Sequence, residues 1–215
     1  MMQWALLGLA VLFVIVAYIV IQGTRAALAW RKAAESGDAK VIRDILEDAL
    51  NGWRSVKRPG TIPVEVWRGL QSAQAVDAGP GFVRVSCQAE GEYRQVDGRW
   101  QEIRNPLQEG FGVTAKAAEM LFYELGHLRP RRVQIDVYTS FREADAPPQL
   151  VCILSTDATR EAARRVDWDE WTAEEIVDGL GGRYRLGDGG RPLPVEVAAP
   201  SQAAAPGGAR AAAQP

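Results

Sequence analysis

The sequence predicts an α+β protein in which an N-terminal single transmembrane helix precedes a small domain. That domain is expected to hold a mainly antiparallel sheet of four to five strands, packed by helices. Three observations lead to this fold class: an uncharged apolar run opens the chain, amphipathic segments of helical period follow, and segments of period two come in pairs with turn residues between them. Paired strands with helices between the pairs favour an antiparallel sheet over a doubly wound parallel one.

The apolar run at residues 4–22 predicts the transmembrane helix. From Trp4 to Ile21 it holds no charged residue, and a helix of this length rises about 27 Å, close to the hydrocarbon thickness of a bilayer. A cleaved signal peptide is the alternative, but no basic residue precedes the run, and the run is long for a signal. Residues 1–3 are then a short non-cytoplasmic tail.

The charges that flank this run predict its orientation. Arg25, Arg31 and Lys32 follow it, and no basic residue precedes it. The positive-inside rule therefore places the rest of the chain in the cytoplasm, below an inner or plasma membrane that the chain crosses once. Residues 23–37 have high helix propensity and are expected to form a stalk. The excess of arginine over lysine, with much alanine and glycine, is typical of a bacterial chain.

Residues 38–197 are the expected α+β domain, and they begin with two helices. Asp38 is a suitable N-cap for an amphipathic helix that runs to about Trp53. The second helix is expected between Pro63, near its first position, and Gly79, past its end.

Two hairpins with a helix between them follow. Period-two alternation begins at Phe82, and Asp97-Gly98 is the turn of the first hairpin. A helix is expected from Thr114 until Pro130 stops it. The second hairpin pairs residues 131–141 with residues 149–156, and the second of these strands is apolar on both faces, which is typical of a central strand.

The domain is expected to end with short elements. A short helix follows Asp157, and Thr172 with Glu175 forms a capping box for another. A brief strand is expected at residues 183–186. The tail at residues 198–215 is rich in Ala, Pro and Gly, a composition typical of disorder.

Composition excludes several classes of function. The chain has one histidine, two cysteines and a net charge of −2. It therefore lacks the ligands of a zinc knuckle and the pairs of a disulfide framework. A carboxylate-only Mg²⁺ or Ca²⁺ site stays open, but the chain has no EF-hand spacing, and we expect no metal or other cofactor. A Ser-His-Asp or Cys-His site depends on His127, whose place at a helix C-terminus favours a capping role. We also expect no nucleic-acid partner, since the charge balance is acidic.

The weak candidates for catalysis are carboxylates on the two predicted hairpins. Asp136 alternates to the polar face of its strand, and Glu90 and Glu92 lie at the first hairpin. If both hairpins share a sheet, these acids meet on its polar face, where paired carboxylates could serve acid–base chemistry. A solvated face with cross-strand ion pairs is the alternative, and we favour it.

The candidates for binding lie in the second half of the domain. Trp168 and Trp171 flank an acidic turn, and an exposed tryptophan there is a candidate anchor for a partner. Arg129, Arg131 and Arg132 form a possible patch for an anionic ligand or an anionic leaflet.

The sequence therefore favours a membrane-anchored cytoplasmic interaction module, such as an accessory subunit, assembly factor or scaffold. Its expected partners are the membrane, through the N-terminal span, and a protein. The anchor and the missing catalytic constellation support this hypothesis over an enzyme. The alternative is a membrane-tethered ligand-binding domain or a carboxylate-dependent enzyme.

Overall fold

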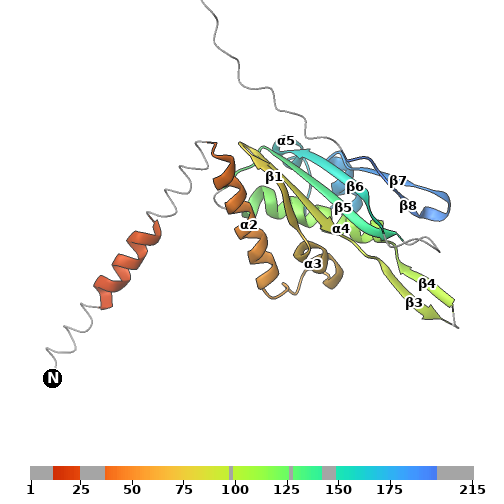
Figure 1. The fold of residues 1–215 in the computed structure, drawn as a ribbon, viewed down its shortest axis with the longest axis horizontal. Helices are drawn as coiled ribbons and strands as arrows, with labels where there is room; N and C mark the ends of the chain where they lie inside the picture. Colours follow the sequence, from red (N-terminus) through yellow and green to blue (C-terminus); the bar gives the residue numbers. More distant parts are fainter. Residues whose placement is uncertain (1–11, 25–36, 97–98, 126–127, 142–148, 198–215) are drawn as a thin grey trace, which may run out of the picture.

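The centre of the protein is a mixed sheet of six strands, in the order β1-β2-β5-β6-β7-β8. The computed structural model describes residues 12–24, 37–96, 99–125, 128–141 and 149–197. Helices pack on one face of the sheet, and a separate two-stranded ribbon, β3–β4, projects from the domain (Figure 1).

The strands of both sheets have the following bounds. They run over Gln74–Gly79 (β1), Phe82–Gln88 (β2), Glu92–Val96 (β3), Arg99–Arg104 (β4), Arg132–Phe141 (β5), Gln149–Thr159 (β6), Arg183–Leu186 (β7) and Pro192–Leu193 (β8).

The helices connect these strands. They run over Ala39–Ser55 (α2), Val64–Gln71 (α3), Pro106–Glu119 (α4), Arg160–Ala163 (α5) and Ala173–Gly179 (α6). A π-helical turn, Met120–Glu124 (η1), continues α4, and a 3₁₀ turn, Asp188–Gly190 (η2), separates β7 from β8.

Helix α2 begins where the sequence predicts. The Asp38 carboxylate accepts the backbone N–H of Lys40 and of Val41, at 2.9 and 3.3 Å, and so satisfies two of the free donors at the helix start. One stripe of the helix faces the core, with Ile42, Leu46, Leu50 and Trp53 buried. The helix packs on β1 at the edge of the sheet.

The sheet differs from the predicted one because β2 and β5 pair in parallel. After β2 the chain leaves the sheet through the ribbon and α4, and then returns beside β2. The first predicted hairpin is thus not part of the main sheet: β3 pairs only with β4. Parallel neighbours need a long crossover connection, and α4 supplies it. The expected four to five strands are corrected to six, and one pair of the sheet is parallel. The other four pairs are antiparallel, as expected, and the hairpin of β5 and β6 is confirmed.

Another correction concerns residues 63–79, which were expected to form one helix. Helix α3 ends at Gln71, and β1 follows as an edge strand that pairs antiparallel with β2. The Ser72 hydroxyl accepts the backbone N–H of Gln88 at 2.8 Å and so ties the helix end to the sheet. Pairing with β2 and packing by α2 favour the extended form, and neither interaction is visible in local propensity.

Helix α4 begins earlier than predicted, at Pro106 instead of Thr114. The Asn105 side chain accepts the Leu107 N–H at 2.8 Å, and Pro106 occupies the first turn, where its missing N–H costs nothing. Gly110 lies against Val137 of β5, at 3.5 Å from an added Cβ, so the helix approaches the sheet closely. Two glycines in the first turns hide this helix from a pattern analysis.

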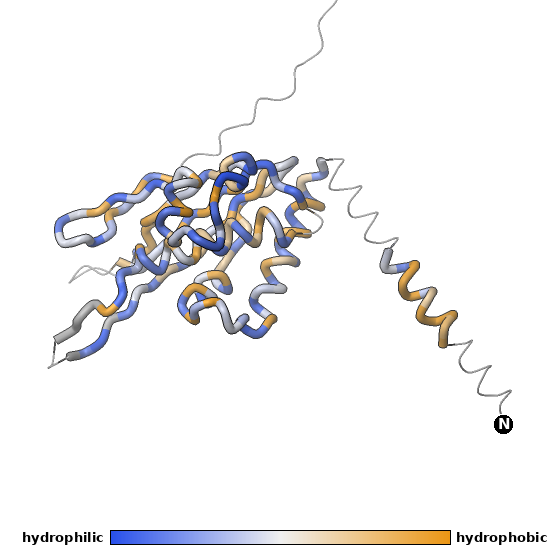
Figure 2. The backbone as a smooth tube through the Cα atoms, turned by 180° about the vertical axis from the view of Figure 1, so that it is seen from behind, coloured by the Kyte–Doolittle hydropathy of each residue, from blue (hydrophilic) through white to orange (hydrophobic). Residues whose placement is uncertain are grey.

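The expected membrane span at residues 4–22 is the largest correction. Residues 12–24 form a helix that is hydrophobic along most of its length (Figure 2). In the part of the chain that the structure describes, no helix has both the length and the apolar character needed to cross a bilayer, so the predicted transmembrane fold class is wrong.

Several other predictions fall on residues outside the described ranges. They are the tail at 1–3, the first part of the span at 4–11, most of the stalk at 25–36, the turn at 97–98, His127 and the tail at 198–215.

Candidate functional site

The helical side of the domain carries a hollow between α3, α4 and α6, which we call the tryptophan groove. Its volume is about 490 Å³. It is lined by Thr61, Ile62, Pro63, Val66, Gly112, Ala115, Lys116, Glu119, Trp168, Trp171, Ala173 and Ile176. Three segments that are distant in sequence therefore form one largely apolar surface.

Trp171 is the most exposed aromatic residue of the groove, with 40% of its surface accessible. Its backbone N–H donates to the Asp167 carbonyl at 3.1 Å. A Cβ at Gly179 would lie 2.8 Å from the Trp171 ring, so only glycine leaves room for the ring there. The capping box of Thr172 and Glu175, confirmed in the structure, starts α6 directly after it. The Trp171 ring thus packs over Gly179 on one side while part of it faces solvent.

Trp168 forms another wall of the groove and is half-buried. Its indole N–H donates to the Ala163 carbonyl at 3.1 Å, and its ring meets Tyr123 edge-to-face at 5.9 Å. Because its polar atom is satisfied inside the protein, Trp168 offers the groove only apolar surface.

The floor of the groove consists of small residues of α4. Gly112 packs against Val66 of α3, where an added Cβ would lie 2.7 Å from a valine methyl group. Ala115 lies one turn further along. Small side chains at these positions leave the space that the tryptophans border.

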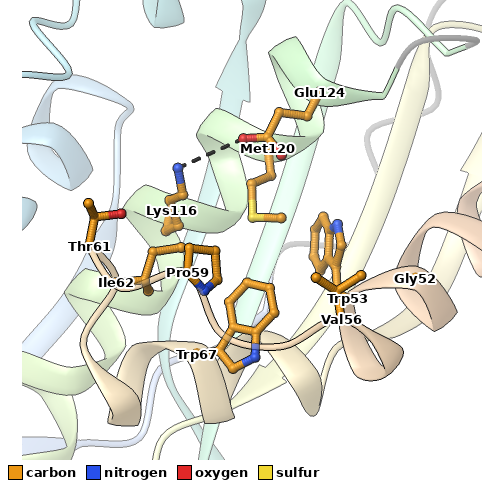
Figure 3. Close-up of a pocket in the computed structure, with 10 residues that line it drawn as sticks. All are labelled: Gly52, Trp53, Val56, Pro59, Thr61, Ile62, Trp67, Lys116, Met120 and Glu124. Carbon is orange, nitrogen blue, oxygen red and sulfur yellow. Dashed lines mark ion pairs between the residues drawn. The ribbon is translucent and has the colours of Figure 1, made fainter.

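A second hollow of about 290 Å³ adjoins the tryptophan groove and shares Thr61, Ile62 and Lys116 with it. Trp53, Trp67 and Met120 surround it (Figure 3). Both of these tryptophans are more than nine-tenths buried, and the Trp67 indole N–H finds no hydrogen-bond acceptor among the described residues. Four of the seven tryptophans of the chain thus line the two hollows.

Lys116 lies between the two hollows in an ion-pair cluster. Its ammonium group lies 2.8 Å from the Glu119 carboxylate and 3.8 Å from that of Glu124 (Figure 3). All three side chains are partly exposed, so the pairs contribute little to stability. They do give the border of the groove an excess of one negative charge.

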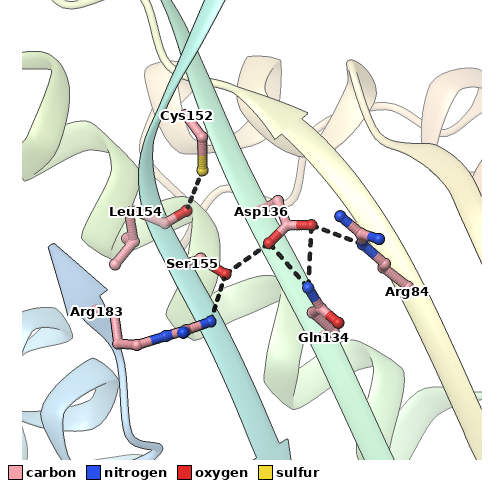
Figure 4. A network of polar contacts seen from close by, with 7 residues as sticks. All are labelled: Arg84, Gln134, Asp136, Cys152, Leu154, Ser155 and Arg183. Carbon is pink, nitrogen blue, oxygen red and sulfur yellow. Dashed lines mark hydrogen bonds and ion pairs between the residues drawn. The ribbon is translucent and has the colours of Figure 1, made fainter. Parts of the chain in front are cut away.

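Asp136, a predicted catalytic candidate, lies on the opposite face of the sheet and is fully buried. Its carboxylate accepts Arg84 Nε at 2.8 Å and the Ser155 hydroxyl at 2.7 Å (Figure 4). The Gln134 amide donates to both of its oxygens, at 3.3 and 3.4 Å, and Arg183 donates to the Ser155 hydroxyl at 3.4 Å. We call this the Asp136 network. It satisfies a buried charge, and that is a structural role.

The other predicted acids do not join Asp136. Glu90 lies 4.0 Å from Arg68, and Glu92 lies 3.3 Å from Arg94 of the projecting ribbon. The proposed meeting of carboxylates fails because the ribbon is not part of the main sheet. Within the described ranges no group of three or more His, Cys, Asp and Glu side chains is placed to hold a metal ion.

The predicted arginine patch separates into two kinds of residue. Arg132 pairs with Asp157 across the strands and lies over the Phe82 ring at 5.7 Å. Arg129 and Arg131 are exposed. Arg160 donates hydrogen bonds to the carbonyl of Pro130, just before β5, and to that of Phe122 in η1. It therefore joins the start of β5 to η1. None of these arginines lines the tryptophan groove.

Sequence reasoning missed most of the groove and one buried carboxylate. Glu109 of α4 is buried, and burial raises its pKa, while the backbone N–H groups of Glu90 and Gly91 and the charge of Arg68 act against that rise. It holds the loop between β2 and β3. Trp168 and Trp171 were predicted as binding candidates because they flank an acidic turn. Val66, Gly112 and Ala115 carry no local signal, since the helix crossings bring them to the groove.

Comparison with known proteins identifies no relative: no family model, no curated protein and no solved structure matches the chain significantly.

Proposed function

We propose that this chain is a protein-interaction module, and that it binds an apolar segment of a partner protein in the tryptophan groove. One observation carries the proposal: Trp171 is 40% exposed, yet its ring packs over Gly179 beside a hollow of about 490 Å³. An aromatic ring that is already ordered loses little entropy on binding, and tryptophan is over-represented among residues that dominate binding energy.

The alternative of a carboxylate-dependent enzyme has less support. Such a site needs acids that converge in a hollow, with titration shifted by their surroundings. Asp136 is fully buried in its network, and Glu90 and Glu92 pair with arginines elsewhere. The groove itself offers only the Lys116 cluster, whose charges already neutralise one another in part.

Site-specific photo-crosslinking in the native host tests the proposal. A photoreactive amino acid at Ala173, which lines the groove, is expected to form a discrete adduct with a partner protein. The same amino acid at Leu150, exposed on β6 and outside the groove, serves as the control and is expected to form none. Adding Trp171→Ala to the Ala173 variant should abolish the adduct. An adduct that persists without Trp171, or equal labelling from both positions, contradicts the proposal.

A further inference from the structure

The turn and helix that carry Trp171 are strongly acidic. Between residues 167 and 175 the chain has five carboxylates and no basic residue. Three of them accept hydrogen bonds within the fold: Asp167 from the backbone N–H groups of Asp169 and Glu170, at 3.2 and 3.1 Å, Glu175 as part of the capping box, and Glu174 from the Tyr184 hydroxyl at 3.4 Å.

Three of the five carboxylates lie on exposed residues outside any ion pair of the described residues. Asp169, Glu170 and Glu174 are exposed, and in the described part of the chain none of them forms an ion pair. Asp169 and Glu170 stand between the two tryptophans of the groove, and Glu174 follows Ala173, which lines it. One rim of the groove therefore has negative charge that the fold does not neutralise.

No cation of the groove offsets this charge. Lys116 is the one basic residue that lines it, and Glu119 and Glu124 already flank its ammonium group. Arg164 and Arg165 precede the acidic segment but do not line the groove. A partner with acidic side chains would meet like charge here, whereas basic side chains would gain Coulomb attraction and a contact with the exposed Trp171 ring.

We infer that the partner segment is cationic as well as apolar: bulky apolar side chains fill the tryptophan groove, and lysine or arginine side chains beside them face Asp169, Glu170 and Glu174. This inference rests on the proposed function and adds the chemistry of the partner to it. Because the acidic rim is exposed, its attraction is screened by salt, so affinity should depend on ionic strength.

Three synthetic peptides test the inference with the full chain. They share one pattern of leucine and phenylalanine, and their remaining positions are all lysine, all glutamine or all glutamate. Fluorescence anisotropy of labelled peptides measures their affinity at low and high salt. We expect the lysine peptide to bind about tenfold more tightly than the glutamine peptide, the glutamate peptide to bind least, and the lysine advantage to shrink as salt rises.

Charge reversal on the rim supplies the matched comparison. Asp169→Lys with Glu170→Lys should remove the preference for the lysine peptide. Both residues are exposed, and among the described residues their hydrogen bonds to Asp167 are made by the backbone N–H groups, which the substitutions keep. Asp44→Lys with Asp48→Lys, two exposed positions of α2, changes the net charge equally and should keep that preference.

The controls separate the two proposals. Trp171→Ala and Ala173→Phe, which fills the groove without removing any packing, should weaken the binding of all three peptides. If neither variant affects any peptide, the groove is not the binding site and the proposed function fails. If binding depends on Trp171 but the glutamine or glutamate peptide binds as well as the lysine peptide, the groove stands and the cationic partner is wrong.

Discussion

The two sides of the sheet use their polar and aromatic residues differently. On the face of the sheet away from the helices, the Asp136 network brings charged and hydroxyl side chains together. The carboxylate of Asp136 is buried and accepts its hydrogen bonds from side chains of the protein (Figure 4). On the helical side, the tryptophan groove exposes aromatic surface that no described element covers. The acids and arginines of the Asp136 network, which resemble catalytic residues, thus stabilise the fold. The aromatic residues of the tryptophan groove, a type common in cores, remain available for binding.

Burial explains this contrast. A buried carboxylate must be matched by donors, so a set of acids and arginines at the centre of a sheet is first a requirement of stability. Exposed tryptophan surface has no such requirement, and its persistence in a folded domain is typical of an interaction site. Four stability measurements can break or sharpen this comparison.

The largest effect is expected from Arg84→Ala in the Asp136 network. The substitution leaves a fully buried carboxylate with only neutral donors, so the free energy of unfolding should fall by about 3–5 kcal/mol in urea denaturation. Arg94→Ala, which removes an exposed pair with Glu92, is the control and should cost less than about 1 kcal/mol. Equal effects would show that Asp136 does not depend on this partner.

Removing two buried hydroxyl groups should affect the stability of the fold differently. Ser155→Ala removes a 2.7 Å hydrogen bond to the Asp136 carboxylate, and hydrogen bonds to charged groups contribute about 1.5–3 kcal/mol. Thr114 of α4 is buried, and its hydroxyl has no hydrogen-bond partner among the described residues. Thr114→Val should therefore leave stability unchanged or raise it by up to about 1 kcal/mol. Thermal unfolding of both variants measures this, and a loss at Thr114 as large as that at Ser155 would contradict it.

The buried Cys87 thiol, on the helical side of β2, should make the free energy of unfolding depend on pH. Burial, and secondarily the charge of Asp136, raises its pKa from 9.0 to about 12. The folded state therefore holds this proton more tightly than the unfolded state does. The resulting stabilisation is complete below pH 9 and is lost as the pH rises from 9 toward 12.

Between pH 8 and pH 10, the wild type should lose about 1 kcal/mol more than Cys87→Ala does. Urea denaturation at the two pH values measures the difference. Parallel pH profiles for the two proteins would mean that the thiol is not desolvated in the folded state.

The smallest effect is expected at the groove itself. Glu119→Gln removes one carboxylate from the partly exposed Lys116 cluster, while Glu124 remains 3.8 Å from the ammonium group. The free energy of unfolding should fall by less than about 1 kcal/mol. A loss comparable to that of Arg84→Ala would mean that the groove border is a structural network, and would weaken its assignment as a binding surface.

The amino-acid sequence by itself determined the local elements. The Asp38 cap of α2, the capping box at Thr172 and Glu175, and the antiparallel pairing of β5 with β6 all follow from spacing along the chain, because the interacting groups are near neighbours. The acidic turn also predicted an exposed tryptophan at 168 or 171, and the structure shows that Trp171 is the exposed one.

Tertiary structure alone decided the rest. The parallel pairing of β2 with β5 brings Arg84 to Asp136, residues 52 positions apart, and the separation of the β3–β4 ribbon takes Glu92 away from them. The end of α3 at Gln71 also depends on tertiary packing, because β1 follows it and pairs with β2. The tryptophan groove exists only where α3, α4 and α6 meet, because a hollow is a property of side chains from several segments, and periodicity within one segment cannot encode it.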